Sequence, residues 1–279
     1  MFGMKSLVNN LKDARKNYPF IIRDVSNYAE QHYANSGCEI KGFLSYNHED
    51  SKKAALVKNL LQVLGINAFM AHEDIMPSSE WDNLIIKELK ECNLFFPVIT
   101  KNFFKSDWTN QECGAAIVRG ITIMPISIAL EGEELEMPRG FLARYQAMKY
   151  ILRDYDKINA NNVFGKSTKS NIELLERIVK AIKDKPEVIS KVRNCFVKSF
   201  VDSNSFNESN LKENVLRILE PFDETQLTML VLGYAFNDQI NNAYPASKSI
   251  EKLIQNNFDR LDYVAKSIWE ASKSKDKIR

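Results

Sequence analysis

The sequence has few of the residues that build metal sites and disulfides, with four cysteines and three histidines among 279 residues. Cys38, Cys92, Cys113 and Cys195 show no C-x-x-C spacing, so they indicate neither a zinc site nor a disulfide framework. We expect free, buried thiols in a reducing compartment.

Histidine-containing motifs give no stronger indication of a metal. The tripeptide His-Glu-Asp occurs at residues 48–50 and again at 72–74. Adjacent side chains point in different directions and rarely converge on one ion. We therefore expect two solvated loops and no metal site.

Long apolar runs and a strong excess of charge are also missing. No apolar run approaches the ~20 residues of a membrane-spanning helix, and residues 1–18 lack the apolar core of a signal peptide. The net charge of +2 is too small to indicate nucleic-acid binding, and the basic segment Lys266–Arg279 is expected to be a solvated end. With 44% hydrophobic and 27% charged residues, the composition indicates a globular protein. We expect a cytoplasmic protein without membrane or nucleic-acid partners.

Five apolar runs are predicted to be strands that alternate with amphipathic helices. After the first run, Val57, Leu60, Leu61 and Leu64 fall at the spacing of one helix face, and Gly65 stands in the usual position to end that helix. Strands that are apolar throughout and joined by helices indicate a parallel sheet covered on both faces. We predict an α/β fold, a flavodoxin-like, doubly wound, parallel five-stranded sheet with flanking all-α segments. The predicted strands are residues 39–45, 67–71, 94–99, 121–128 and 147–152.

Three further helices are predicted from their N-terminal signals. These are Ser78 or Ser79 before a helix near Trp81, Ser106 before a helix to about Arg119, and the capping box Ser170-x-x-Glu173 before a helix to about Asp184.

The chain divides into three predicted regions. An N-terminal helical segment takes residues 1–36, the α/β domain residues 37–185, and a C-terminal helical bundle residues 187–279. Beyond Pro186 the strand pattern stops and only helical patterns follow. The predicted bundle helices are residues 188–200, 211–219, 225–236, 247–256 and 258–272.

Polar segments follow three of the predicted strands, at residues 45–48, 72–77 and 100–107. Ligands of open parallel sheets bind beyond the carboxyl ends of the strands. The three segments are therefore expected to converge on one cleft, as they would in any flavodoxin-like sheet.

Three motifs in this order resemble a TIR (Toll/interleukin-1 receptor) domain over about residues 38–150. The first is Ser45-Tyr46 in KGFLSYNHED, and the second is the segment Asp74–Trp81, in which Ser78 replaces the usual glycine. The third is a Ser-x-Trp segment with an acidic residue four positions after the Trp, here Ser106, Trp108 and Glu112. In these motifs the chain is similar to the NAD-hydrolysing TIR proteins of prokaryotic antiviral defence.

The resemblance implies that Glu112 is catalytic and that NAD⁺ is a substrate rather than a bound cofactor. Nicotinamide leaves as a neutral molecule, so one carboxylate that stabilises the oxocarbenium-like transition state can suffice. Trp108, one helical turn earlier, would stack on the nicotinamide or the adjoining ribose. Because Glu112 lies near a helix N-terminus, we expect it to be ionised.

Simpler structural roles stand beside these functional ones. Thr109-x-x-Glu112 also reads as a capping box. Tyr46, Phe69 and Trp81 can be core aromatics, and Ser45 can bond to the loop backbone. The predicted substrate contacts are Trp108, Ser45, Tyr46, Phe69, Asp74, Trp81 and Ser106.

The resemblance also implies activation by self-association through the TIR domains, and the C-terminal bundle is a candidate surface for a partner protein. The product is left open between ADP-ribose and a cyclic variant. Two alternatives remain at this stage, a non-catalytic interaction module and a deoxyribosyltransferase-like enzyme that acts on free nucleosides.

Overall fold

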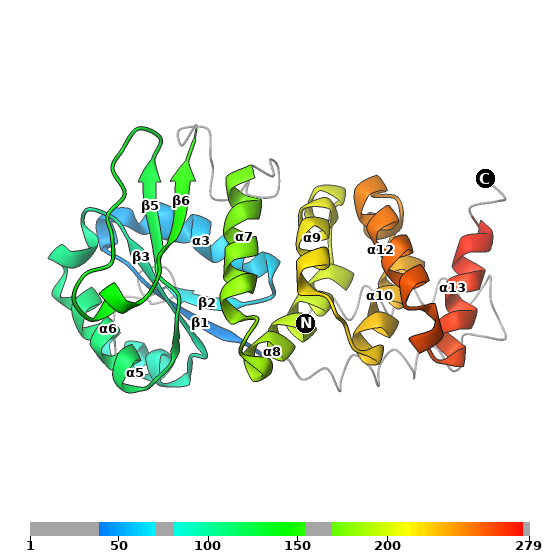
Figure 1. Cartoon of the computed structure of the whole chain (residues 1–279), viewed down its shortest axis with the longest axis horizontal. Helices are drawn as coiled ribbons and strands as arrows, with labels where there is room; N and C mark the ends of the chain where they lie inside the picture. Colours follow the sequence, from blue (N-terminus) through cyan, green and yellow to red (C-terminus); the bar gives the residue numbers. More distant parts are fainter. Residues whose placement is uncertain (1–38, 71–80, 154–168, 276–279) are drawn as a thin grey trace. The chain divides into compact units, whose positions relative to one another are not determined.

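The computed structural model describes residues 39–70, 81–153 and 169–275. These residues fall into two compact units, residues 39–191 and residues 192–275 (Figure 1). The predicted helical segment 1–36 lies outside the described residues, and the predicted domain limits stay predictions.

The first unit is built on a parallel sheet with strand order β2-β1-β3-β5-β6. Strand β4 pairs with the beginning of β3 and β5 pairs with its end, so both occupy one position of the sheet. The predicted strand 121–128 is thus wrong as a single element, because Pro125 has no N–H with which to continue the ladder. The predicted five-stranded parallel α/β fold is confirmed. The strands are β1 Lys41–Ser45, β2 Asn67–Met70, β3 Leu94–Ile99, β4 Thr122–Ile123, β5 Ile126–Leu130 and β6 Met148–Leu152.

Helices cover both faces of this sheet (Figure 1). On one face, α3 (Ser51–Val63) contacts α7 (Lys169–Ile182), and on the other α5 (Trp81–Glu91) contacts α6 (Asp107–Val118). The predicted cap at Ser170 is wrong, since Ser170 lies inside α7. Three short 3₁₀ helices are η1 (His48–Asp50), η2 (Phe103–Lys105) and η3 (Gly140–Arg144).

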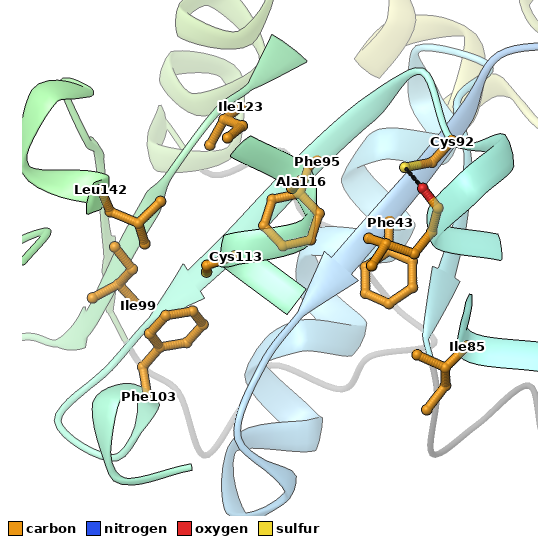
Figure 2. Packing of buried hydrophobic residues seen from close by; sticks show 11 residues of the cluster. Phe43, Ile85, Cys92, Phe95, Ile99, Phe103, Cys113, Ala116, Ile123 and Leu142 are labelled. Atoms are coloured by element: carbon orange, nitrogen blue, oxygen red, sulfur yellow. Dashed lines mark hydrogen bonds between the residues drawn. The ribbon is translucent and has the colours of Figure 1, made fainter. Parts of the chain in front are cut away.

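The core beneath α5 and α6 fixes the position of α6. Figure 2 shows Phe43 of β1 and Phe95 of β3 packed among side chains of α5 and α6. The two rings are stacked, with centroids 5.7 Å apart. From α6, Cys113 and Ala116 enter the same cluster. Because side chains two residues apart share a face of a strand, Ser45 follows Phe43 on the face that α6 covers.

The second unit is helical. In addition to the predicted helices it contains the short α11, and the predicted helix 258–272 is broken at Leu261 and Asp262 into η6 and α13. Within the unit, α10 contacts α12 and α13, and α9 contacts α12. The elements are α8 Pro186–Val201, which begins in the first unit, α9 Phe206–Leu219, α10 Glu224–Phe236, α11 Asp238–Asn241, α12 Tyr244–Asn256, η6 Phe258–Arg260 and α13 Tyr263–Lys275.

None of the helices in the described part of the chain is long and apolar enough to cross a membrane.

Candidate functional site

A buried hydrogen bond joins the end of β1 to helix α6. The hydroxyl of Ser45 donates to Oε2 of Glu112 over 2.6 Å, across 67 positions of sequence. Ser45 is fully buried and Glu112 is 8% exposed. Strand alternation turns Ser45 toward α6, and the buried stripe of Thr109, Glu112, Cys113 and Ala116 turns Glu112 toward the sheet. The fold therefore brings together two residues that the sequence placed separately in the candidate site.

The environment of Glu112 favours the neutral carboxyl. Burial raises the pKa of Glu112 to about 7, although the hydrogen bond from Ser45 acts in the opposite direction. The expectation that Glu112 stays ionised rested on its place near a helix N-terminus and did not include the loss of hydration, which makes the carboxyl harder to ionise.

The N-terminus of α6 shows that Glu112 does not cap the helix. Ser106 is the N-cap, and its hydroxyl accepts from the backbone N–H of Thr109 at 3.5 Å. The hydroxyl of Thr109 donates to the carbonyl of Phe103 at 2.6 Å, which ties η2 to α6. The alternative capping box from Thr109 to Glu112 is therefore wrong. Ser106, predicted as a substrate contact, lies where it caps the helix that carries Glu112.

Trp108 lies on the first turn of α6, four residues before Glu112. Its side chain is 45% exposed, which is unusual for a residue of this size. An exposed indole one turn from a buried carboxyl has the arrangement of a stacking surface beside a reactive group.

A second polar cluster ties together the loops that follow β1 and β3. Asp50 is 5% exposed, and its Oδ2 accepts from the hydroxyl of Thr100 at 2.6 Å and from Nδ2 of Asn102 at 3.3 Å. Nδ2 of Asn47 donates to the carbonyl of Asn102 at 3.0 Å, and Lys53 forms an ion pair with Asp50 at 3.1 Å. The expectation that residues 48–50 form a solvated loop is wrong for Asp50, although His48 and Glu49 are exposed.

Sequence reasoning placed the residues of this cluster in loops at the strand ends, with Asp50 expected in a solvated one, and did not bring them together. The one available signal is that Asn47, Asp50 and Thr100 all follow apolar strands of a parallel sheet, where loops converge. Each polar group in the cluster has a partner within the protein, so the cluster fixes the loops beside Ser45 and Glu112.

With this geometry established, the sequence can be compared with known proteins. Residues 43–161 match the family model of the TIR domain. The chain contains a TIR domain. A similar solved structure is the TIR domain of the Toll-related receptor TRR-2 from the lower metazoan Hydra magnipapillata, with 22% identity and a TM-score of 0.32. The alignment covers 39% of this chain and 82% of that one. No curated protein matches the chain.

The other predicted contacts in the TIR domain have less distinctive positions. Phe69 is half-buried against the core, with its ring 5.4 Å from that of Phe43, and Tyr46 is buried. Trp81 begins α5, and Asp74 lies outside the described residues. The structure thus brings Ser45 and Glu112 into contact, with Trp108 one turn away on the same helix.

Two further observations concern other kinds of site. A surface cavity of about 540 Å³ near β4 is lined by Ile117, Thr122, Arg144, Tyr145 and Lys185 among others, and none of the predicted site residues lines it. Among the described residues, no group of three or more His, Cys, Asp or Glu side chains is arranged to hold a metal ion. The described cysteines, Cys92, Cys113 and Cys195, are buried and form no disulfide with one another.

Proposed function

We propose that the TIR domain cleaves the bond between nicotinamide and ribose in NAD⁺. The observation that carries the proposal is the environment of Glu112. It is a buried carboxyl with a serine hydroxyl as its hydrogen-bond partner, one turn after an exposed tryptophan. The TIR family includes enzymes that hydrolyse NAD⁺, and perturbed carboxyl groups of this kind concentrate at active sites.

The chemistry needs one carboxylate. When the bond between nicotinamide N1 and ribose C1′ breaks, its electron pair moves to N1 and neutralises the pyridinium ring. Positive charge develops on the ribose, and the ionised form of Glu112 stabilises it. Water then adds to C1′ and loses a proton, which gives ADP-ribose and free nicotinamide.

A pKa of about 7 suits Glu112 to this sequence of steps. Both charge states of Glu112 are then accessible near neutral pH, and a base with this pKa accepts the proton of the attacking water efficiently. Trp108 supplies an aromatic face for the nicotinamide or the adjoining ribose. If a nitrogen of the adenine captures C1′ in place of water, the same intermediate gives a cyclic ADP-ribose.

The biological role that we propose is antiphage defence in the cytoplasm, with activity switched on by self-association of TIR domains. The helical unit is the candidate surface for an additional protein partner.

The test is a chromatographic time course of nicotinamide release from NAD⁺ by the full chain, at high protein concentration with a crowding agent. The variant is Glu112→Gln, which keeps the size of the side chain but cannot ionise. The matched control is Glu91→Gln, because Glu91 is a surface residue that pairs with Lys41, and an exposed pair contributes little to stability.

We expect wild type and Glu91→Gln to release nicotinamide at similar rates, and Glu112→Gln to be slower by about a thousandfold. Equal rates for all three proteins would remove Glu112 from the catalytic role. Absence of release by the wild type under these conditions would contradict the enzyme proposal. The co-product separates hydrolysis from cyclisation.

One observation favours a second candidate, a non-catalytic interaction module. Three large apolar side chains on α6 and the neighbouring η3 are exposed, namely Trp108, Val118 and Phe141. Exposed apolar side chains on elements that contact each other are candidates for protein contacts. Nicotinamide release that depends on Glu112 would decide between the two functions, because surface contacts alone do not need a buried carboxyl.

A further inference from the structure

The contact between Ser45 and Glu112 is constrained from both sides. Ser45 is the last residue of β1, and its backbone is in register with Pro97 of β3. Glu112 is held by the packing of α6 through Cys113 and Ala116. The hydroxyl and the carboxyl thus meet at 2.6 Å without contact with bulk solvent at Ser45.

We propose that Ser45 is a positioning residue that holds the carboxyl of Glu112 in place and favours its ionised form at neutral pH. The inference rests on the proposed function, in which ionised Glu112 is the active form. Ser45 itself makes no bond to the reacting atoms in this role.

The direction of the hydrogen bond explains the preference. An ionised carboxylate can only accept, so the Ser45 hydroxyl donates to it. After protonation the carboxyl can donate to the serine oxygen instead, but a bond between two neutral groups is weaker than one to a charged acceptor. The hydroxyl therefore favours the ionised state, against the burial that favours the neutral one.

Charged groups on the elements that pack against α6 do not favour ionised Glu112 in place of the Ser45 hydroxyl. Among the described residues, burial and the Ser45 hydroxyl are the causes that set the pKa of Glu112. Burial and the nearby Glu112 raise the pKa of the Cys113 thiol to about 12, so this neighbour stays neutral. Apart from Glu112, the charged residues with described side chains on α6, at its C-cap and on the elements that pack on it are Lys41, Lys87, Glu88, Lys90, Glu91, Lys105, Asp107, Arg119 and Arg144.

Several of these charges have partners of their own. Lys41 pairs with Glu91 at 2.7 Å, and Lys105 donates to Oδ1 of Asn102 at 3.0 Å. Arg119 donates to the carbonyl of Leu89. Removal of the Ser45 hydroxyl therefore leaves burial as the remaining cause among the described residues, and Glu112 becomes harder to ionise.

The experiment compares wild type, Ser45→Ala and Ser45→Thr in the full chain. Ser45→Ala deletes the donor with little change in volume, and Ser45→Thr keeps a hydroxyl. The pKa of Glu112 is read by carbon NMR of the labelled carboxyl, assigned with Glu112→Gln. In parallel, kcat/KM for nicotinamide release is measured from pH 5.5 to pH 8.5, with a blank without enzyme at each pH.

In wild type, Glu112 should titrate near pH 7, and kcat/KM should fall as the pH drops through the same range. In Ser45→Ala we expect a pKa higher by about one, a kcat/KM lower by about fivefold at pH 7, and recovery to within about twofold at pH 8.5. Ser45→Thr should restore the wild-type profile. A merely structural role would lower kcat/KM equally at every pH.

The outcomes separate the two proposals. An unchanged pKa of Glu112 in Ser45→Ala overturns the inference, whatever the activity. A raised pKa with no nicotinamide release by wild type supports the positioning role and contradicts the proposed function. Should Ser45→Ala fail to fold, Ser45→Cys takes its place, because a thiol is a much weaker donor than a hydroxyl. An unchanged pKa of Glu112 in Ser45→Cys overturns the inference, and a raised pKa supports it.

Discussion

Glu112 in the TIR domain and Glu251 in the helical unit both lose part of their contact with water, yet their pKa values shift in opposite directions. Burial raises the pKa of Glu112 to about 7, and the hydrogen bond from the Ser45 hydroxyl offsets only part of that shift. Burial also raises the pKa of Glu251, but hydrogen bonds from Lys273, Lys248 and Tyr234 outweigh it and lower the pKa to about 2. Burial alone therefore does not decide whether a carboxyl is ionised. The number and charge of its hydrogen-bond donors also count.

The difference separates a carboxyl with a structural role, Glu251, from the carboxyl that we propose to be reactive, Glu112. Glu251 lies on α12 and links it to α10 and α13 through Tyr234 and Lys273. Lys273 also lies over the ring of Trp269, which contacts Tyr234 with centroids 4.9 Å apart. Glu251 is an acceptor in a complete network. At Glu112 the single hydrogen bond from Ser45 does not make up for the hydration that the ionised carboxylate loses on burial. Groups that change their charge during a reaction are often found in such environments.

The sharpest test of this comparison is the pH dependence of stability in wild type and Glu112→Gln. The folded-state pKa of about 7 lies above the unfolded value of about 4.5. The contribution of Glu112 to the free energy of unfolding is therefore fully present below pH 4.5 and is lost as the pH rises through 7. Glutamine does not ionise. Urea unfolding of both proteins should show Glu112→Gln gaining up to about 3 kcal/mol relative to wild type between pH 4.5 and pH 8.5.

Glu91→Gln is again the control, and its stability should run parallel to wild type over this range. A constant difference between wild type and Glu112→Gln would mean that the carboxyl ionises as easily in the folded chain as in the unfolded one. The comparison with Glu251 would then fail.

The opposite sign is expected for Glu251→Gln in the helical unit. The variant removes a charged acceptor from three donors, and we expect a loss of about 2 kcal/mol at pH 7. The loss should shrink as the pH falls below 4.5 toward 2, because the folded-state pKa of Glu251 is lowered and its contribution disappears in that window. Amide hydrogen exchange of α12 and α13 reports the effect in this unit alone.

A double-mutant cycle with Lys273→Met identifies the partner that matters. The coupling between the two changes should be about 1 kcal/mol. Additive losses would show that Lys273 and Glu251 act independently, and the structural role given to this network would be wrong.

Much of the sheet could be predicted because its strands are apolar throughout. The run Leu94–Ile99 is buried at every position, and its boundaries in the structure are the predicted ones. The convergence of loops at the carboxyl ends also follows from parallel topology, and the contact of Asn47 with Asn102 is an instance of it. The sequence had already separated the apolar strand residues from the polar residues that follow them.

The predictions were incomplete where a residue's surroundings come from distant parts of the chain. Glu112 was expected to be ionised because only its own helix was considered, whereas the sheet that buries it lies 67 positions away at Ser45. Asp50 was expected in a solvated loop, and its partner Thr100 lies 50 positions away. Local signals such as Thr109-x-x-Glu112 resemble a cap in sequence, but tertiary contacts decide which side chain has that role.

The smallest predicted effect compares the helix caps of the two units. Asp223 begins α10 with a complete capping box, in which the N–H of Gln226 donates to Oδ1 of Asp223 at 2.8 Å and the N–H of Asp223 donates to Oε1 of Gln226 at 2.9 Å. Ser106 begins α6 with one contact of 3.5 Å, which is longer than an ordinary hydrogen bond. Asp223→Ala should cost about 1 kcal/mol of unfolding free energy, and Ser106→Ala less than about 0.5 kcal/mol.

Matched variants test whether the caps themselves are responsible. Asp223→Asn keeps an acceptor and should retain most of the stability, and Ser106→Asp should stabilise α6 because a carboxylate is a better cap and interacts favourably with the helix N-terminus. Urea unfolding measures all four variants. Equal losses for Asp223→Ala and Ser106→Ala would mean that the 3.5 Å contact is as strong as the complete box. The first turn of α6, where Trp108 lies, would then be capped as strongly as that of α10. The hypothesis that α6 has the weaker cap would be wrong.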